Sequence, residues 1–235
     1  MLDTLTDLPI IASLLKERYR DFDHRNPLNP LADLIFIICS VQTSKSKYER
    51  AYSSLRKRYP TFQELREASF SGLCVALAPS GLASQKARYI FELMRRLTLE
   101  FGRPTLSPLR SWSDDDCERF LCGLPGVGKK VARCVMLMAL GRAVFPVDVH
   151  CWRISKRLGW ICSNSRTSRT SPTPREMDML QERIPAEHRY SLHVNFISLG
   201  REFCKSDKPD CCRCPIKAYC SFSGRVEVSS LCQSL

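Results

Sequence analysis

The chain has 235 residues, of which 44% are hydrophobic, enough to bury a core in one large domain or two small ones. The N-terminus lacks a basic leader, and no apolar run is long enough to span a membrane, so we expect neither a secretory signal nor a membrane span. We therefore expect an intracellular protein, in the cytoplasm and nucleoid if bacterial or in the nucleus if eukaryotic. Lys and Arg outnumber Asp and Glu by 36 to 24, a net charge of +12 that favours a polyanionic partner such as nucleic acid, with a solvated basic surface as the alternative.

The thirteen cysteines do not indicate a disulfide framework. Their number is odd, no export signal precedes them, and most lie singly in apolar segments. We expect the scattered ones to be small buried thiols: Cys39, Cys74, Cys117, Cys122, Cys134, Cys151 and Cys162. Five others lie within residues 204–220 and need a separate explanation.

Helix signals recur from the N-terminus, whereas strand signals are nearly absent. Asn29 and Pro30 cap a buried helix over LADLIFIICSVQ, and a second helix continues past Tyr48 towards Pro60. Thr61 with Glu64 predicts a capping box for a short helix, and an amphipathic helix is expected over 83–101. The pattern predicts an all-α fold.

The second half continues the same pattern. Ser113 caps a helix over 114–122, and another runs over 129–140. Further helices are expected at VHCWRISKRL, capped by Asp148, at MDMLQERI after Thr173 and Pro174, and at 187–203. Residues 163–174, rich in Ser, Thr, Arg and Pro, predict a mobile loop.

A glycine-cornered turn, LPGVGKKVA at residues 124–132, joins two of these helices. Gly126 and Gly128 can take conformations closed to other residues and let a backbone come close. The N–H groups and dipole at the start of the second helix would then bind phosphate without reading sequence. Taken alone, the turn is also compatible with an ordinary helix connection.

LPGVGKKVA matches the helix-hairpin-helix motif nearly residue for residue, and with the PVD that follows, the chain resembles the endonuclease III family of DNA glycosylases over about residues 28–222. The resemblance implies a helical domain at 28–143, an iron-sulfur domain at 1–27 and 144–225, and a tail at 226–235, with DNA bound between the domains. It implies that Lys130 is the catalytic lysine, whose amine attacks the sugar C1′, forms a Schiff base and permits β-elimination. A phosphate-binding surface lysine is the alternative. The helix N-terminus and Lys129 disfavour the ammonium form of Lys130 and DNA phosphates favour it, so its pKa stays open.

Asp148, in FPVDVH, matches the essential aspartate of that family. A helical rise of about 15 Å over 130–140 leaves the following residues enough length to return to Lys130. As an N-cap, Asp148 would be anionic and could stabilise charge on the deoxyribose or help to deprotonate the nucleophile. Taken alone, the residue is better explained as a structural cap, and the hairpin at a suitable distance favours the catalytic role.

The resemblance further implies that the enzyme flips a nucleotide out of the duplex and fills the gap. Gln42 matches the inserted glutamine and Leu82 the wedge leucine, although either side chain alone would suit ordinary surface or core. The DNA-binding set implied is Gln42, Leu82, Gly126, Gly128, Lys129 and His150.

REFCKSDKPDCCRCPIKAYC places Cys204, Cys211, Cys214 and Cys220 at the spacing C-x6-C-x2-C-x5-C, with Cys212 left over. By residue type, four such thiolates suit a [4Fe-4S] cluster or a zinc ion. The spacing resembles the iron-sulfur loop of the endonuclease III family, which favours the [4Fe-4S] cluster as a structural cofactor of a basic loop.

Together these features predict a monomeric bifunctional DNA glycosylase and AP lyase of base excision repair. Its partner would be double-stranded DNA that holds a damaged or modified pyrimidine or an abasic site. The FPVD context and the RISKRLGW run also resemble the plant 5-methylcytosine glycosylases, so a modified-base glycosylase is the first alternative. A non-catalytic iron-sulfur DNA-binding or redox-sensing protein is the second.

Overall fold

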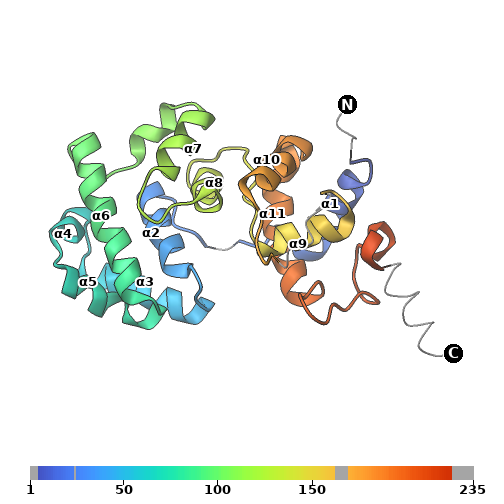
Figure 1. Ribbon diagram of the computed structural model, residues 1–235, viewed down its shortest axis with the longest axis horizontal. Helices are drawn as coiled ribbons and strands as arrows, with labels where there is room; N and C mark the ends of the chain where they lie inside the picture. The colour runs from blue at the N-terminus through green and yellow to red at the C-terminus, as the bar shows by residue number, and fades with distance from the viewer. Residues whose placement is uncertain (1–4, 24, 162–168, 224–235) are drawn as a thin grey trace. The chain divides into compact units, whose positions relative to one another are not determined.

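The computed structural model describes residues 5–23, 25–161 and 169–223, and in these residues it contains helices and no strand (Figure 1). The predicted all-α fold is confirmed. Cys162, residues 163–168 of the predicted loop and the predicted tail at 226–235 lie outside the described residues. None of the helices in the described ranges is both long and apolar enough to cross a membrane.

The chain divides into two compact units, one of residues 25–142 and one that combines residues 1–24 with 143–235. The predicted domain limits, 28–143 and 1–27 with 144–225, lie a few residues from this division. Each unit is described by itself below.

The unit 25–142 is built around α2, whose Leu34 and Ile35 have no exposed surface. The Asn29 side chain accepts hydrogen bonds from Leu31 N and Ala32 N, which starts the helix where the sequence predicted. Helices α3, α6 and α8 pack against α2. The elements are α2 (Pro30–Ser40), α3 (Lys45–Arg58), α4 (Phe62–Glu67), α5 (Phe70–Leu77), η1 (Ala78–Ser80), α6 (Ala83–Phe101), η2 (Ser107–Ser111), α7 (Asp114–Cys122) and α8 (Lys129–Met138).

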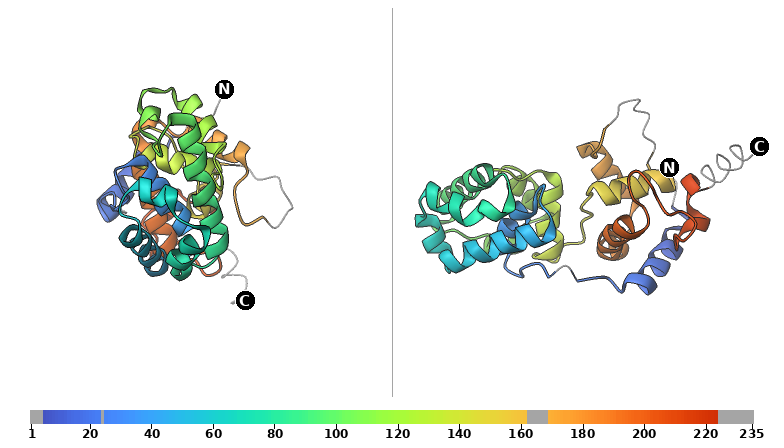
Figure 2. Two further views of the ribbon diagram at one scale, coloured as in Figure 1. Left: turned by 90° about the vertical axis from the view of Figure 1, so that its left-hand side faces the viewer. Right: turned by 90° about the horizontal axis from the view of Figure 1, so that it is seen from below.

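The other unit packs α11 against both α1 and α9, so the first helix of the chain and the last long helix share one core. Figure 1 and Figure 2 show the blue α1 in the same unit as the orange α10 and α11. Phe145, Leu192 and Phe196 are fully buried in this core. Its elements are α1 (Leu8–Tyr19), α9 (Val149–Leu158), α10 (Pro174–Arg183), α11 (Ala186–Glu202) and the 3-10 helix η3 (Lys217–Tyr219).

The expected burial of the scattered cysteines is confirmed in part. Those buried are Cys39, Cys117, Cys134 and Cys151. The prediction was wrong for Cys122, which is exposed, and Cys74 is only half-buried. Cys122 ends α7 one residue after the buried Leu121, and successive residues on a helix point about 100° apart, so its thiol turns away from the core.

Candidate functional site

The turn between α7 and α8 requires a glycine at position 126. Gly126 has φ +74°, in the left-handed region, and a Cβ added there would lie 2.5 Å from the ring of Tyr89. Leu124 and Val127 are buried on either side, and Val127 N donates to Leu124 O at 3.2 Å. The turn is therefore fixed by packing against α6 as well as by its backbone.

Gly128 is glycine for a different reason. Its φ of −94° is open to any residue, so of the two glycines only Gly126 takes a conformation that other residues rarely adopt. No described atom lies within 4 Å of a Cβ added at Gly128, and α8 begins there without a side-chain cap. The start of α8 thus has no side-chain cap and has free space beside Gly128, two features that a binding site for an anion would need.

The first turn of α8 carries Lys129 and Lys130. Lys129 Nζ lies 3.1 Å from Glu118 Oε1 on α7, and Arg133, which is 2% exposed, donates to Glu118 Oε2 at 2.6 Å. Glu118 therefore holds Lys129 and ties the two helices of the turn together. Glu118 and Arg133 were not predicted from sequence, because an ion pair between helices leaves no local pattern.

Lys130 is half-buried and lies within electrostatic range of Asp33 on α2. Asp33 has no exposed surface, and burial raises its pKa to about 7, against the opposing effects of the Asn26 hydrogen bond and the Lys130 charge. A wholly buried carboxyl group beside the predicted nucleophile was also missed by sequence reasoning. Its position on an otherwise apolar helix was the available signal.

Gln42, Leu82 and Gly126, which the sequence assigned to DNA contact, line one pocket of about 180 Å³. Gln42 and Leu82 both have φ +50°, which is uncommon for residues other than glycine and marks strained turns. Leu82 is 49% exposed. Three segments far apart in sequence thus present these residues around a single hollow, which Ile38, Val41, Gln85, Lys86 and Tyr89 complete.

Lys86 fixes the two strained turns relative to each other. Its buried ammonium donates to Cys39 O at 2.7 Å, to Thr43 Oγ1 at 2.7 Å and to Ser80 O at 3.0 Å. These acceptors flank Gln42 on one side of the pocket and Leu82 on the other. Burial lowers the pKa of Lys86, and the three acceptors compensate its charge.

In the other unit, Asp148 caps α9, as predicted. Its Oδ1 accepts from His150 N at 2.9 Å and Cys151 N at 2.8 Å, bonds that favour the carboxylate form. Lys130 and Asp148 belong to different units, so their pairing stays a prediction.

His150 is held tightly at the start of α9. A Cβ added at Gly200 would lie 2.4 Å from His150 Nδ1, and Arg153 Nη2 lies 3.0 Å from the same nitrogen. Burial lowers the pKa of His150, although Asp148 opposes the shift. The ring is therefore neutral at physiological pH and fixed in place.

The four cysteines with the iron-sulfur spacing line one small cavity. Cys204, Cys211, Cys214 and Cys220 surround it, whereas Cys212 is exposed. Burial raises the pKa of Cys214 to about 11, and the other three thiols add to the shift, so they lie within electrostatic range. Arg157 Nη1 donates to Cys204 Sγ at 3.1 Å.

This set fits a metal centre in number, residue type and common cavity. In the described residues, no group of three His, Cys, Asp or Glu side chains lies close enough together to hold a metal ion. The fit therefore rests on the shared cavity rather than on ligand geometry.

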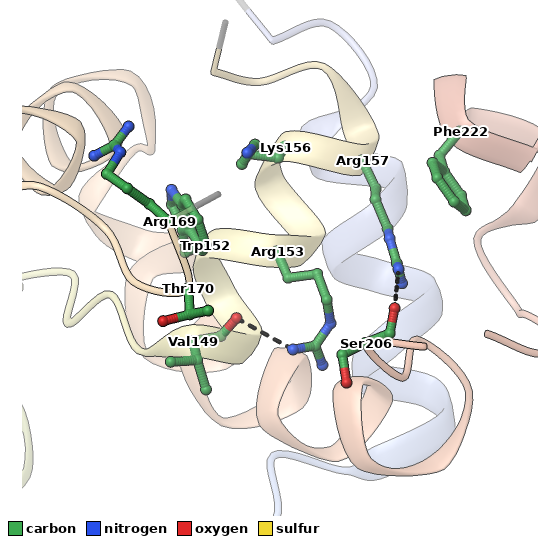
Figure 3. Close-up of a pocket in the computed structure, with 9 residues that line it drawn as sticks. All are labelled: Val149, Trp152, Arg153, Lys156, Arg157, Arg169, Thr170, Ser206 and Phe222. Atoms are coloured by element: carbon green, nitrogen blue, oxygen red, sulfur yellow. Dashed lines mark hydrogen bonds between the residues drawn. The ribbon is translucent and has the colours of Figure 1, made fainter. Parts of the chain in front are cut away.

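A basic pocket of about 430 Å³ lies beside the cysteine loop (Figure 3). Lys156 lies 4.5 Å from the centre of the Trp152 ring, and Arg157 donates to Ser206 O at 3.0 Å. Arg169 is neutralised by Glu176, whereas Arg153 donates to backbone carbonyls. The pocket therefore combines net positive charge with an aromatic wall.

Comparison with known proteins supports the predicted resemblance. Residues 35–177 match the model of the HhH-GPD superfamily base excision DNA repair protein. Endonuclease III of Thermotoga maritima is 30% identical over 218 residues, which cover 90% of this chain and 94% of that protein. DEMETER-like protein 2 of Arabidopsis thaliana is 32% identical over 168 residues, 64% of this chain and 12% of that protein.

A solved structure of a non-covalent endonuclease III–DNA complex superposes with a TM-score of 0.77 at 25% identity, covering 94% of this chain and 97% of that one. The predicted resemblance is confirmed. The chain therefore belongs to the HhH-GPD superfamily of base excision DNA repair proteins.

Proposed function

We propose that this DNA glycosylase is bifunctional, with both base-excision and AP lyase activity on double-stranded DNA. The observation that carries the proposal is a lysine, Lys130, in the first turn of α8, directly after an uncapped turn with open space at Gly128. A glycosylase that only hydrolyses the glycosidic bond, without lyase activity, needs no amine at this position. An amine at a phosphate-binding turn lies where a deoxyribose would be presented.

In the proposed reaction the lone pair of neutral Lys130 Nζ forms a bond to C1′ while the C1′–N glycosidic bond breaks. The bond electrons leave with the base, which then takes up a proton. Ring opening gives a Schiff base between Nζ and C1′, and loss of a C2′ proton expels the 3′ phosphate by β-elimination. The Asp148 carboxylate stabilises positive charge on the sugar as the base departs.

Each of the two units supplies its own proposed contacts to the duplex. In the unit 25–142, Gln42 and Leu82 fill the gap left by a flipped nucleotide, and the N–H groups after Gly128 bind a phosphate. In the other unit, Lys156 and its neighbours in the basic pocket contact the backbone.

We also propose that Cys204, Cys211, Cys214 and Cys220 hold a [4Fe-4S] cluster, supported by their common cavity and their spacing. Such a cluster would supply structural cross-linking, since all four cysteines are used as ligands. This chain's own residues, Lys205, Lys208, Arg213 and Lys217, would then be ordered as a basic loop. A zinc ion is the alternative occupant.

The proposed substrate is a damaged or modified pyrimidine. A 5-methylcytosine-type activity is the second candidate, because the FPVD context and the RISKRLGW run resemble the plant 5-methylcytosine glycosylases. Duplexes that each contain one modified base, scored for strand cleavage, would identify the substrate.

Borohydride reduction tests the lyase proposal. The protein is incubated with abasic-site duplex and borohydride, and a covalent protein–DNA adduct is expected. Lys130→Ala should abolish the adduct, whereas Lys129→Ala, which removes the neighbour paired with Glu118, should retain it. No adduct in the unmodified protein would contradict the proposal and favour a non-catalytic DNA-binding protein. An adduct of equal yield in Lys130→Ala would contradict the role of Lys130 and point to another amine.

A further inference from the structure

Lys86 is a buried cation whose hydrogen-bond partners are all neutral. It lies in the first turn of α6 and is 2% exposed. Its ammonium donates to Cys39 O, Thr43 Oγ1 and Ser80 O, which are two backbone carbonyls and a hydroxyl. Burying a charge among neutral acceptors costs more free energy than burying an apolar side chain of the same size. Packing alone therefore does not account for a lysine at this position.

Lys86 completes the C-terminal end of α2. The last four carbonyls of a helix have no N–H partner inside that helix. Three of those in α2 have local donors: Ile37 O accepts from Ser40 Oγ at 2.7 Å, Ile38 O from Val41 N at 3.4 Å and Ser40 O from Thr43 N at 3.2 Å. The fourth, Cys39 O, accepts from Lys86 Nζ, and the helix dipole also favours a cation here. The turn after α2, which contains Gln42, is thus closed by a residue of another helix.

The same lysine also holds the turn that precedes α6. Its ammonium donates to Ser80 O, and its backbone N donates to Leu82 O at 3.0 Å. Between these acceptors, Gly81 and Leu82 are two successive residues with positive φ, and Leu82 provides no side-chain cap for the helix. The start of α6 is therefore held by Lys86 rather than by a cap.

The two turns are joined to each other at Thr43. Its hydroxyl donates to Ser80 O and accepts from Lys86 Nζ, so one small network connects the residue after Gln42 with the turn at Leu82. Gln42 and Leu82 both have φ +50°, a conformation that persists only where the surrounding structure holds it. Gln42 is exposed and Leu82 is 49% exposed, so the network holds their backbones while their side chains are free to contact a partner.

We propose that Lys86 is a positioning residue for gap filling, whose buried ammonium holds the turns of Gln42 and Leu82 together so that both side chains enter the duplex as one unit. The inference rests on the proposed role of Gln42 and Leu82. Without the ammonium, each turn can relax to an unstrained backbone conformation, and the two side chains no longer fit the same gap. Lys86 acts through the two turns rather than on the duplex.

The test uses a duplex that contains a tetrahydrofuran analogue of an abasic site, with 2-aminopurine facing it in the opposite strand. Stacking quenches 2-aminopurine, so side chains that enter the gap and displace this base should raise its fluorescence. The analogue cannot form a Schiff base, which makes the measurement independent of lyase activity. At saturating protein, Lys86→Met should lose most of the rise, whereas Lys57→Met, at an exposed lysine of α3, should keep it.

A cycle of variants separates positioning from a general loss of structure. The quantity measured is the ratio of the affinities for the analogue duplex and for the same duplex without the analogue. Lys86→Met should lower this ratio about fivefold, and Gln42→Ala combined with Leu82→Ala should lower it by at least as much. Adding Lys86→Met to that pair should lower the ratio no further, because Lys86 acts only through these two residues. Multiplied losses, or an unchanged ratio in Lys86→Met, would overturn the inference.

Thr43→Val keeps the inference testable if circular dichroism shows that Lys86→Met does not fold. This variant removes one acceptor of the ammonium and the hydroxyl that donates to Ser80 O, and it retains the two carbonyl acceptors. A partial loss of the fluorescence rise is expected. If the rise is unchanged in Thr43→Val, the network does not position the two turns and the inference fails.

Failure of the proposed gap filling would look different. An unmodified protein that leaves 2-aminopurine quenched contradicts the role proposed for Gln42 and Leu82, and this inference with it. A normal rise that depends on Leu82 but not on Lys86 contradicts the positioning role alone.

Discussion

Gly126 and Gly128 lie two residues apart and are glycines for opposite reasons. The first is required inside the protein by its positive φ and by the Tyr89 ring, and the second leaves space outside it. Gly126→Ala should therefore lower the free energy of unfolding by about 2 kcal/mol or more, because backbone strain adds to a steric clash. Gly128→Ala should change stability by less than about 0.5 kcal/mol.

The effect of these variants on duplex affinity should not follow their effect on stability. Gly128→Ala should weaken binding although the protein is intact, since its Cβ occupies the space for a phosphate. Urea unfolding and duplex titration of both variants check this. A stable Gly126→Ala, or full duplex affinity in Gly128→Ala, would contradict the roles given to the two positions.

Lys86 joins the two turns that carry Gln42 and Leu82 through buried hydrogen bonds. Lys86→Met keeps most of the side-chain volume but leaves Cys39 O, Thr43 Oγ1 and Ser80 O without this donor. The expected loss is about 1–3 kcal/mol of unfolding free energy, measured by urea denaturation. The exposed Lys57 on α3 provides the control, and Lys57→Met should leave stability unchanged. Equal stability of the two variants would show that the three hydrogen bonds of Lys86 do not stabilise the protein.

Asp33 should also make stability depend on pH. Its folded pKa of about 7 lies above the unfolded value of 3.8, so the folded state binds the proton more strongly. Its contribution to stability is full below pH 3.8 and is lost as pH rises through 7. Asp33→Asn should therefore be more stable than the unmodified protein at pH 8, by about 2–4 kcal/mol, and gain much less at pH 4. Thermal unfolding at both pH values measures this. A gain that does not grow with pH would mean that Asp33 is not neutral when folded at low pH.

The side chains that sequence reasoning missed have one feature in common. Lys86, Glu118 and Asp33 each act on a residue from a different helix, and such contacts leave no periodicity or spacing in the chain. Lys130 could be predicted because the surrounding hairpin is local in sequence. Recognition of short motifs therefore locates the candidate nucleophile but not these contacts between helices.

At the scale of elements, helix starts could be predicted well because capping is local. The side chains of Thr61, Ser113 and Thr173 accept the backbone bonds expected of N-caps, and two of them form complete capping boxes. Helix ends were less certain. The helix predicted over 129–140 ends at Met138, where Leu140 N turns back to Val135 O. The short α5 was missed although Ser69 caps it, because its apolar run has no clear period.

The cysteine loop is the element whose order should depend on a bound metal. Regular helix is limited there to the short η3, and four thiols line its cavity. Cys214→Ala should remove the visible absorbance of the purified protein and most of its iron, whereas Cys212→Ala, at an exposed cysteine, should retain both. Metal analysis of protein purified without oxygen checks this. Zinc in place of iron in the unmodified protein would contradict the iron-sulfur proposal and leave a structural metal site.

For the whole molecule, the positive charge is unequally divided between the units. Residues 25–142 contain nineteen Lys and Arg against ten Asp and Glu, whereas the rest of the chain contains seventeen against fourteen. The unit with the hairpin thus carries most of the net charge of +12. The more balanced unit concentrates its cations locally, around Trp152 and the cysteine loop. A polyanion would accordingly be attracted mainly by one unit and contacted at a defined place by the other.

This distribution predicts a steep salt dependence of duplex binding, with one separable contribution from the basic pocket. The logarithm of the binding constant should fall linearly with the logarithm of salt concentration, by about 0.9 for each phosphate neutralised. Lys156→Gln should reduce the magnitude of this slope by about one if Lys156, which lies over the Trp152 ring in the pocket, neutralises one phosphate as proposed. Lys16→Gln is the matched control, because Lys16 is exposed on α1 and paired with Asp21 at 3.5 Å, and its slope should equal that of the unmodified protein. Titrations of undamaged duplex at four salt concentrations give the three slopes. Identical slopes for Lys156→Gln and Lys16→Gln would mean that the pocket binds no phosphate and that the charge of residues 25–142 accounts for the salt dependence.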